Sequence, residues 1–243
     1  MSKFDWKGSL RMAAQSAYTG KLVRGIKRIL AAPEKNLVDP AWVLDVIRRI
    51  GLRYDRRGIY GSDAKYMNFL GPGLWQIPEQ FAGALVKLGA MRPANLLEIG
   101  TCDGWTCSVM TAYLLRFYPG FRALTVDPIN QFPAWKRVQK LLPVEFRQAT
   151  SDDLTGEKFD LCFIDGDHSM DWVRRDFDQA GRFARICMFH DINDALAGNG
   201  AVMAFWQELK IRFPGKRRWE FAGHPEKVAV MGIGILQSEP EEG

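Results

Sequence analysis

The segment at residues 95–106 constrains the fold of this chain more than any other stretch, and it reads NLLEIGTCDGWT. A short apolar run, a break at Gly100 and a helical pattern after Gly104 are typical of a buried strand, a glycine turn and a helix. Glycines in such a turn let the backbone approach a ligand closely, and the first N–H groups of the helix face the same space. The dinucleotide pattern G-x-G-x-x-G is not matched, because Cys102 and Trp105 stand where it needs glycine. A nicotinamide or flavin cofactor is therefore disfavoured.

Downstream of this turn, short apolar runs alternate with helical patterns. The predicted strands are 95–99, 123–127, 145–149, 159–165 and 186–191, and the predicted helices lie near 104–117, 131–141, 169–182 and 200–212. Such alternation favours an α/β fold with a doubly wound, Rossmann-like and largely parallel sheet. The chain ends differently, since 218–222, a turn around Gly223–Pro225 and 228–236 predict a terminal antiparallel hairpin.

The basic charge of the chain is concentrated in an N-terminal arm. The net charge is +5, while residues 1–32 alone carry seven Lys and Arg against one Asp, so the remainder is close to neutral. Leu22, Ile26 and Ile29 recur at helical spacing among basic residues, which predicts a basic amphipathic helix. This helix either packs on its own domain or a sister subunit, or lies on an anionic membrane surface. After it, we expect a capped helix at 40–50, an irregular connection at 51–75 and a helix at 78–88.

Bulk properties are those of a globular protein. Hydrophobic residues make up 47% of the chain and charged residues 25%. The sequence shows no signal-like apolar core at its start and no run long enough to span a membrane. The four cysteines form no C-x-x-C pair. A reducing, cytoplasmic setting is therefore expected.

The spacing of Glu98, Gly100 and Gly104 resembles motif I, E-x-G-x-x-x-G, of class I S-adenosylmethionine (SAM) methyltransferases. A glycine often found between the two glycines of that motif is Cys102 here. The resemblance implies that these three residues and Thr101 position SAM, with Glu98 acting through water or backbone. Motif I alone leaves another interpretation open, in which the glycines serve only packing.

Two residues after later strands extend the expected cofactor site. Asp127 ends the second predicted strand, where an acid can accept hydrogen bonds from both ribose hydroxyls. Standing before Pro128, it is otherwise a common turn former. Ser151 follows the third predicted strand, in the stretch that meets the adenine edge in methyltransferases of this kind. Its alternative role is to cap the helix that follows.

A second set of motifs is more specific. The segments FIDGDHSMDWVRRDF at 163–177, FHDIN at 189–193 and FWQEL at 205–209 resemble methyltransferase family 24, with its pattern I-D-G-D-H-S-Y-x-x-V-x-x-D, F-H-D-I and F-W-x-x-L. The resemblance covers about residues 76–236. It implies a seven-stranded sheet whose last strand inserts antiparallel, in agreement with the predicted hairpin. We expect a basic helical extension at 1–75 and the SAM-dependent methyltransferase domain at 76–243.

Asp165 and Asp191 are predicted to converge, because each ends one of two neighbouring strands on the ligand-binding side of the sheet. Two carboxylates repel unless a cation joins them, so Mg²⁺ or a similar oxygen-seeking ion is a candidate ligand. The resemblance to catechol-type O-methyltransferases implies a third, amide ligand directly after the second acid, where this chain has Ile192. Asn193 or Asp167 is the candidate substitute, and the need for a metal stays open.

The proton of an acceptor hydroxyl must leave as the methyl group arrives, which a base or a metal can arrange. His168 falls where the catechol-type enzymes keep their general base, so we expect His168 to accept the proton beside Asp165. His190 is the competitor, and its more ordinary role is that of a buried histidine that orients Asp191. Tryptophans such as Trp75, Trp105, Trp135 and Trp172 are candidate walls of an acceptor pocket, although core packing is their commoner role.

These observations predict a SAM-dependent methyltransferase that acts on a hydroxyl of a small molecule or sugar, and no specific nucleic-acid partner. One alternative is a hydroxylase or oxidoreductase on the same scaffold. Another is a membrane-surface or nucleic-acid-associated module that uses the basic arm. A peripheral membrane contact through residues 1–32 and a homo-oligomer are further expectations.

Overall fold

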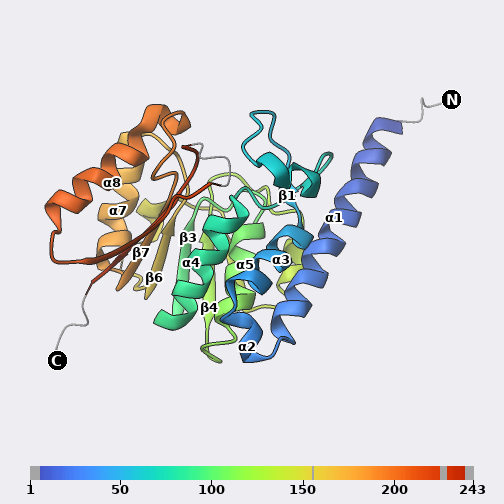
Figure 1. The fold of residues 1–243 in the computed structure, drawn as a ribbon, viewed down its shortest axis with the longest axis horizontal. Coiled ribbons are helices and arrows are strands. Elements are labelled where there is room, and N and C mark those ends of the chain that lie inside the picture. The colour runs from blue at the N-terminus through green and yellow to red at the C-terminus, as the bar shows by residue number, and fades with distance from the viewer. Residues whose placement is uncertain (1–5, 155, 225–228, 239–243) are drawn as a thin grey trace.

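The computed structural model describes residues 6–154, 156–224 and 229–238, with side chains from residue 15 onward. Seven strands in these ranges form one mixed sheet in the order β5-β4-β3-β6-β7-β9-β8 (Figure 1). Their bounds are β3 Asn95–Ile99, β4 Arg122–Val126, β5 Val144–Arg147, β6 Leu161–Ile164, β7 Ile186–His190, β8 Arg217–Phe221 and β9 Ile233–Gln237. Strands β3 to β7 are parallel, whereas β9 is antiparallel to both β7 and β8. The predicted doubly wound sheet with an antiparallel ending is confirmed.

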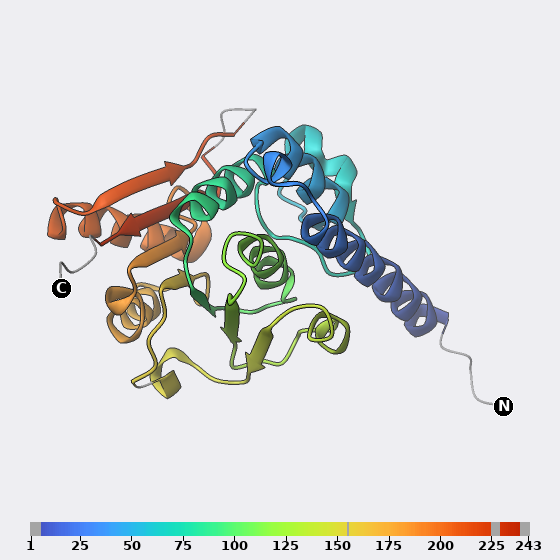
Figure 2. The ribbon, with the colours of Figure 1, turned by 90° about the horizontal axis from the view of Figure 1, so that it is seen from below.

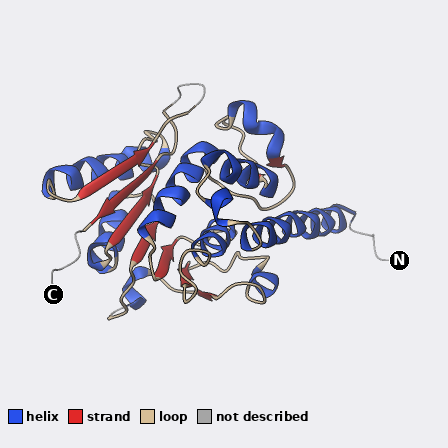
Figure 3. Ribbon diagram, turned by 60° about the horizontal axis from the view of Figure 1, so that its bottom comes forward, coloured by secondary structure: helices blue, strands red, loops and turns tan. Residues whose placement is uncertain are grey.

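Helices cover both faces of the sheet, as Figures 2 and 3 show. Their bounds are α1 Trp6–Leu30, α2 Glu34–Leu37, α3 Pro40–Ile50, α4 Pro78–Met91, α5 Trp105–Leu114, α6 Trp135–Val138, α7 Met170–Gln179 and α8 Ala201–Arg212. Alternate strand residues face opposite layers: Leu96 packs in the cluster with α1, α3, α4 and α5, whereas Leu97 packs in the cluster with α7 and α8. Strands buried on both faces explain the continuous apolar runs in the sequence.

The N-terminal helices belong to one of these two layers. Leu22 and Ile26 of α1 are fully buried, and they share a hydrophobic cluster with residues of α3, α4 and α5. Arg24 and Lys27 are exposed. The predicted amphipathic helix is present, and over its described side chains the apolar face packs on the protein itself. Helix α3 is capped as predicted, because the side chain of Asp39 accepts a hydrogen bond from Ala41 N at 2.9 Å. Among the described residues, no helix combines the length and hydropathy that crossing a bilayer needs.

Three segments differ from the sequence prediction. The helix expected at 131–141 is limited to the four residues of α6, with turns on either side, and Pro133 disfavours helical backbone at Phe132 before it. The connection at 51–75 contains a small parallel pair, β1 (Leu52–Arg53) and β2 (Met67–Asn68), and a 3₁₀ helix at Gly61–Tyr66. Strand β9 begins only at Ile233, and the predicted turn residue Pro225 and strand start Val228 lie outside the described residues.

Candidate active site

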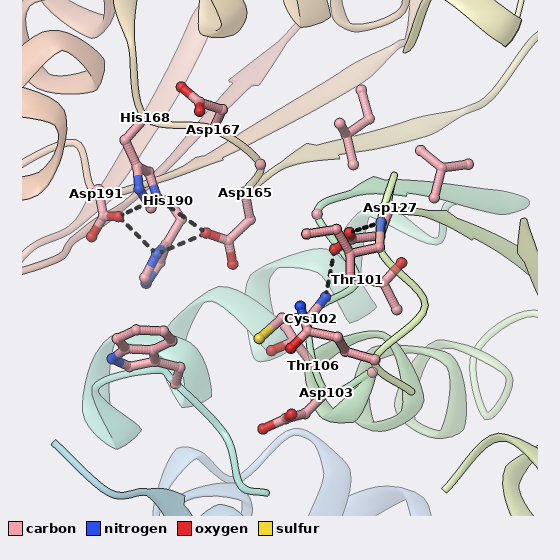
Figure 4. A pocket seen from close by; sticks show the side chains of 18 of the residues that line it. Thr101, Cys102, Asp103, Thr106, Asp127, Asp165, Asp167, His168, His190 and Asp191 are labelled. Atoms are coloured by element: carbon pink, nitrogen blue, oxygen red, sulfur yellow. Dashed lines mark hydrogen bonds and ion pairs between the residues drawn. The ribbon is translucent and has the colours of Figure 1, made fainter. Parts of the chain in front are cut away.

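A cavity of about 680 Å³ opens at the carboxyl ends of the parallel strands (Figure 4). Its lining includes eight of the residues that the sequence singles out for the site: Gly100, Thr101, Gly104, Asp127, Ser151, Asp165, His168 and Asp191. They come from the loops that follow β3, β4, β5, β6 and β7. The cavity therefore lies where ligands bind in open α/β sheets.

The glycines of the first turn are required by the backbone itself. Gly100 has φ +100°, and a Cβ there would lie 2.1 Å from the carbonyl oxygen of Asp165. Gly104 has φ +71°, and a Cβ there would lie 2.4 Å from the ring of Phe132. Cys102, between them, also has a positive φ of +47°. The packing role proposed for the glycines is thus correct, and both glycines also line the cavity.

Asp127 lines the cavity and also organises the turn. Its Oδ2 accepts a hydrogen bond from Cys102 N at 3.0 Å, and its Oδ1 accepts one from Ile129 N at 2.8 Å. Each carboxylate oxygen has a further lone pair for a ligand hydroxyl. The turn-forming role and the predicted ribose-binding role are therefore compatible in this geometry.

Glu98, which we expect to act on SAM through water or backbone, does not itself line the cavity. Glu98 is 1% exposed and lies behind the cavity, where it accepts a hydrogen bond from Thr125 Oγ1 at 2.5 Å. Thr125 Oγ1 is 2.7 Å from Thr101 Oγ1, and Thr101 does line the cavity. Burial raises the pKa of Glu98 well above its usual value. The carboxylate of Glu98 is therefore connected to the cavity through these two threonines.

Ser151 is fully buried and donates a hydrogen bond to Asp176 Oδ1 at 2.6 Å, so its hydroxyl does not cap the 3₁₀ turn at Ser151–Leu154. Asp176, on α7, also lines the cavity, and it is the last residue of the pattern I-D-G-D-H-S-Y-x-x-V-x-x-D, although we predicted no role for it from the sequence. Burial raises the pKa of Asp176 to about 6, against the opposing effect of the Ser151 hydrogen bond. A carboxyl that changes charge near neutral pH therefore stands in the wall of the predicted adenine region.

Asp165, His168, His190 and Asp191 form a compact group that we call the Asp–His cluster (Figure 4). His190 Nδ1 lies 3.0 Å from Asp165 Oδ1 and 3.4 Å from Asp191 Oδ2. His168 Nε2 lies 2.9 Å from Asp191 Oδ2 and 4.0 Å from Asp165 Oδ1. The two carboxylates do converge as predicted, and two imidazoles stand between them.

Charge pairing controls protonation in the Asp–His cluster. The carboxylates of Asp165 and Asp191 beside its ring raise the pKa of His168 to about 10, against the effect of its burial. Burial opposes ionisation of Asp191, but His190 and His168 hold its pKa far below the usual value. The pKa of His190 is also raised, because the attraction of both carboxylates outweighs burial. His190 is 4% exposed, in keeping with its predicted role as a buried orienting residue.

Three members of the cluster also have the arrangement of metal ligands. Single ligand atoms of Asp165, His168 and Asp191 lie within 4.8 Å of one another, and no other such group exists among the described residues. The candidate substitutes for an amide ligand are not part of it. The backbone of Asn193 pairs with Met231, and Asp167 Oδ1 accepts a hydrogen bond from Ser169 N. The donor set of two carboxylates and an imidazole suits a divalent cation with some affinity for nitrogen.

Several cavity residues come from outside the motifs. Arg53, Arg57 and Trp75 reach the cavity from the connection that the sequence left irregular, and Asp194 and Met231 from loops beyond β7. Of the four tryptophans considered, Trp75, Trp105 and Trp172 line the cavity, whereas Trp135 packs against Phe132 and Phe146. Arg53 lies in a two-residue strand, which is too short for an alternating pattern to predict it, whereas Trp75 is one of the tryptophans expected at the pocket.

Comparison with known proteins places this geometry in a family. Residues 97–192 match the family model described as a methyltransferase domain. No curated protein matches the chain. An O-methyltransferase from Bacillus cereus, in complex with SAH, has a TM-score of 0.55 and 15% identity, with 94% of this chain and 100% of that chain covered. The O-methyltransferase TomG from Streptomyces achromogenes, involved in tomaymycin synthesis and in complex with SAM, has a TM-score of 0.51 and 18% identity, with 77% and 92% covered.

The structural likenesses establish the fold, and the family model gives the domain type. Its matched segment runs from β3 through the loop after β7, so it contains the glycine turn, Asp127 and the whole Asp–His cluster. The resemblance inferred from the sequence motifs is thereby confirmed. Residues 97–192 of this chain thus match a methyltransferase domain, on a fold shared with O-methyltransferases crystallised with SAM or SAH.

Proposed function

We propose that the protein transfers the methyl group of SAM to a hydroxyl oxygen of a small molecule, with a sugar among the candidate acceptors. The observation that carries the proposal is the shared cavity, in which the glycine turn and Asp127 stand beside the Asp–His cluster. One end of the cavity has the glycine turn and Asp127, which can hold a nucleoside, and the other end has the Asp–His cluster, which can take up a proton. An in-line transfer needs both ends in one enclosed space.

The cofactor pose follows from the positions of these groups. Asp127 would accept hydrogen bonds from the ribose hydroxyls, Ser151 and Asp176 would stand at the adenine edge, and the turn at Gly100 and Thr101 would face the sulfur. The side chain of Asp165 then lies near the sulfonium, whose positive charge suits a cavity lined by several carboxylates.

His168 is the proposed acceptor of the hydroxyl proton. In the protein without ligands its raised pKa makes it a cation, which is the wrong form for a base. A bound sulfonium adds positive charge beside the same carboxylates, and a neighbouring like charge lowers the pKa of an imidazolium. Cofactor binding thus prepares His168 to take the proton as the methyl group moves from sulfur to oxygen, leaving a neutral thioether. Burial and two carboxylate contacts suit His190 to a positioning role.

A divalent cation is a second way to balance the two carboxylates. Asp165 and Asp191 would hold it, as the sequence suggests, with His168 in place of an amide. When bound, such a cation would polarise the acceptor hydroxyl and make its proton easier to remove. The residues present fit that group, because the third donor is an imidazole within reach of both acids.

The other expectations from the sequence remain predictions. All four cysteines are free, which supports the proposed cytoplasmic setting. Membrane contact through residues 1–32 and a homo-oligomer are separate proposals, to be tested by vesicle binding and by light scattering.

The test is an assay with methyl-labelled SAM and a panel of hydroxyl-bearing acceptors. Label transferred to a product that gains one methylene by mass supports the proposal, and a product that gains one oxygen supports the hydroxylase alternative. His168→Gln should lower kcat while SAH binding persists. Loss of SAH binding without a change in kcat would contradict the role given to His168.

A further inference from the structure

We infer that Arg53, which lies outside the family-matched segment, binds the carboxylate of the methionine part of SAM. This inference rests on the proposed function, because it concerns the same cofactor in the same cavity. SAM is a zwitterion at its amino-acid end, so its carboxylate needs a cation or several N–H donors when it leaves water. The structure supplies a guanidinium at the corresponding place.

The position of Arg53 follows from its contacts with two adjacent residues of the glycine turn, Cys102 and Asp103. The backbone N–H of Cys102 donates to Asp127, the proposed ribose ligand, while its Sγ accepts from Arg53 Nη1. The same Nη1 lies 3.1 Å from Asp103 Oδ2. In SAM the amino-acid chain is joined through sulfur to the ribose, so its carboxylate lies a few bonds from the sugar. Arg53 contacts the same turn whose backbone Asp127 holds, so its guanidinium lies beside the expected path of the amino-acid chain.

The backbone of Arg53 is fixed on both sides. It pairs with Asn68 in the β1–β2 sheet, and its N–H donates to Leu74 O at 2.8 Å. Gly73 packs so closely that a Cβ there would lie 2.5 Å from Arg53 N. The guanidinium also lies over the ring of Trp75, with 4.6 Å from its central carbon to the ring centroid. A cation held in this way loses little side-chain freedom when it binds an anion.

The ion pairs of the cavity make Arg53 a better candidate than Arg57 for binding the carboxylate of SAM. Arg53 and Arg57 are the Lys or Arg residues that line it among the described residues. Arg53 pairs with one acid, Asp103, whereas Arg57 pairs with two: its Nη2 lies 3.0 Å from Asp55 Oδ2, and its Nη1 lies 3.8 Å from Asp194 Oδ2. Both polar contacts of Arg53 use Nη1, and a guanidinium has further N–H donors on Nε and Nη2.

The experiment compares two ligands that differ only in the carboxylate: SAH and decarboxylated SAH, which keeps the adenosine, the sulfur and the amine. Isothermal titration calorimetry on the full chain gives the dissociation constant of each. The wild type should bind SAH about 10- to 100-fold more tightly, the range expected for hydrogen bonds to a charged group. Arg53→Met should reduce SAH affinity to that of the decarboxylated ligand, whose own affinity should not change. Arg57→Met is the matched control and should keep the full preference.

Each outcome decides the matter. If the wild type binds both ligands equally, or if Arg53→Met keeps the preference, the carboxylate is bound elsewhere, for example at the N-terminus of α5, and the inference is wrong. Equal losses for both ligands in Arg53→Met would also overturn it, since they indicate a structural role. Arg53→Lys retains the positive charge and should keep part of the preference for SAH. This variant keeps the inference testable if Arg53→Met does not fold. If the wild type binds neither ligand, the proposed function itself fails.

Discussion

Substituting Gly100 by alanine tests whether the glycine turn needs its close packing against the backbone of Asp165. At φ +100° an alanine costs about 1–3 kcal/mol in backbone strain. Its Cβ would also lie 2.1 Å from Asp165 O and 2.7 Å from Gly166 N, so backbone must move, and such overpacking costs about 1–3 kcal/mol more. We therefore expect Gly100→Ala to lower the free energy of unfolding by about 2–6 kcal/mol.

Gly156 provides the matched control. It has φ +82°, and a Cβ there would meet nothing within 4 Å, so Gly156→Ala shows the backbone cost alone. Urea unfolding followed by circular dichroism measures both variants, and calorimetry with SAH shows whether the displaced Asp165 loop weakens cofactor binding. The reasoning fails if Gly100→Ala is no more destabilising than Gly156→Ala.

Three further predictions concern charge in the cavity. The pKa of Asp176 rises from 3.8 to about 6 on folding, so this residue costs about 2–3 kcal/mol of stability as pH rises from below 4 to above 6. In urea unfolding, Asp176→Asn should therefore be stabilising at pH 7.5 but not at pH 3.5, and equal effects at both would contradict the shift. Asp127→Asn should raise the dissociation constant of SAH about 10-fold or more, whereas Asp153→Asn, an acid that bonds its own loop outside the cavity, should not. Mn²⁺ should bind the wild type with release of a proton from His168, and Asp191→Asn should abolish the binding signal in calorimetry; an unchanged titration would refute the metal arrangement.

The sequence was sufficient to predict the sheet and the residues that follow the carboxyl ends of its parallel strands. Buried strands leave continuous apolar runs, and the residue after each run must fall at one edge of a parallel sheet. For that reason Asp127, Asp165 and Asp191 were found without knowledge of the contacts between strands.

The sequence was insufficient where function depends on side-chain direction or on short elements. Glu98 occupies a motif position, yet its side chain is buried and does not line the cavity, and a one-residue alternation along the strand decides which side chains do. Arg53 lies in a two-residue strand that no periodicity can reveal. The protonation of His168 depends on how close the carboxylates of Asp165 and Asp191 lie to its ring. The spacing of these residues in the sequence does not give those distances, so the raised pKa of His168 could not be predicted from it.

The central claim is that one cavity holds the nucleoside of SAM at Asp127 and presents its sulfur to the Asp–His cluster. A crystal structure of the protein with bound SAH tests it most directly. The account predicts ribose hydroxyls within hydrogen-bond distance of Asp127 and the sulfur on the side of Asp165 and His168. Electron density for SAH outside this cavity, or a ribose without contact to Asp127, would contradict it.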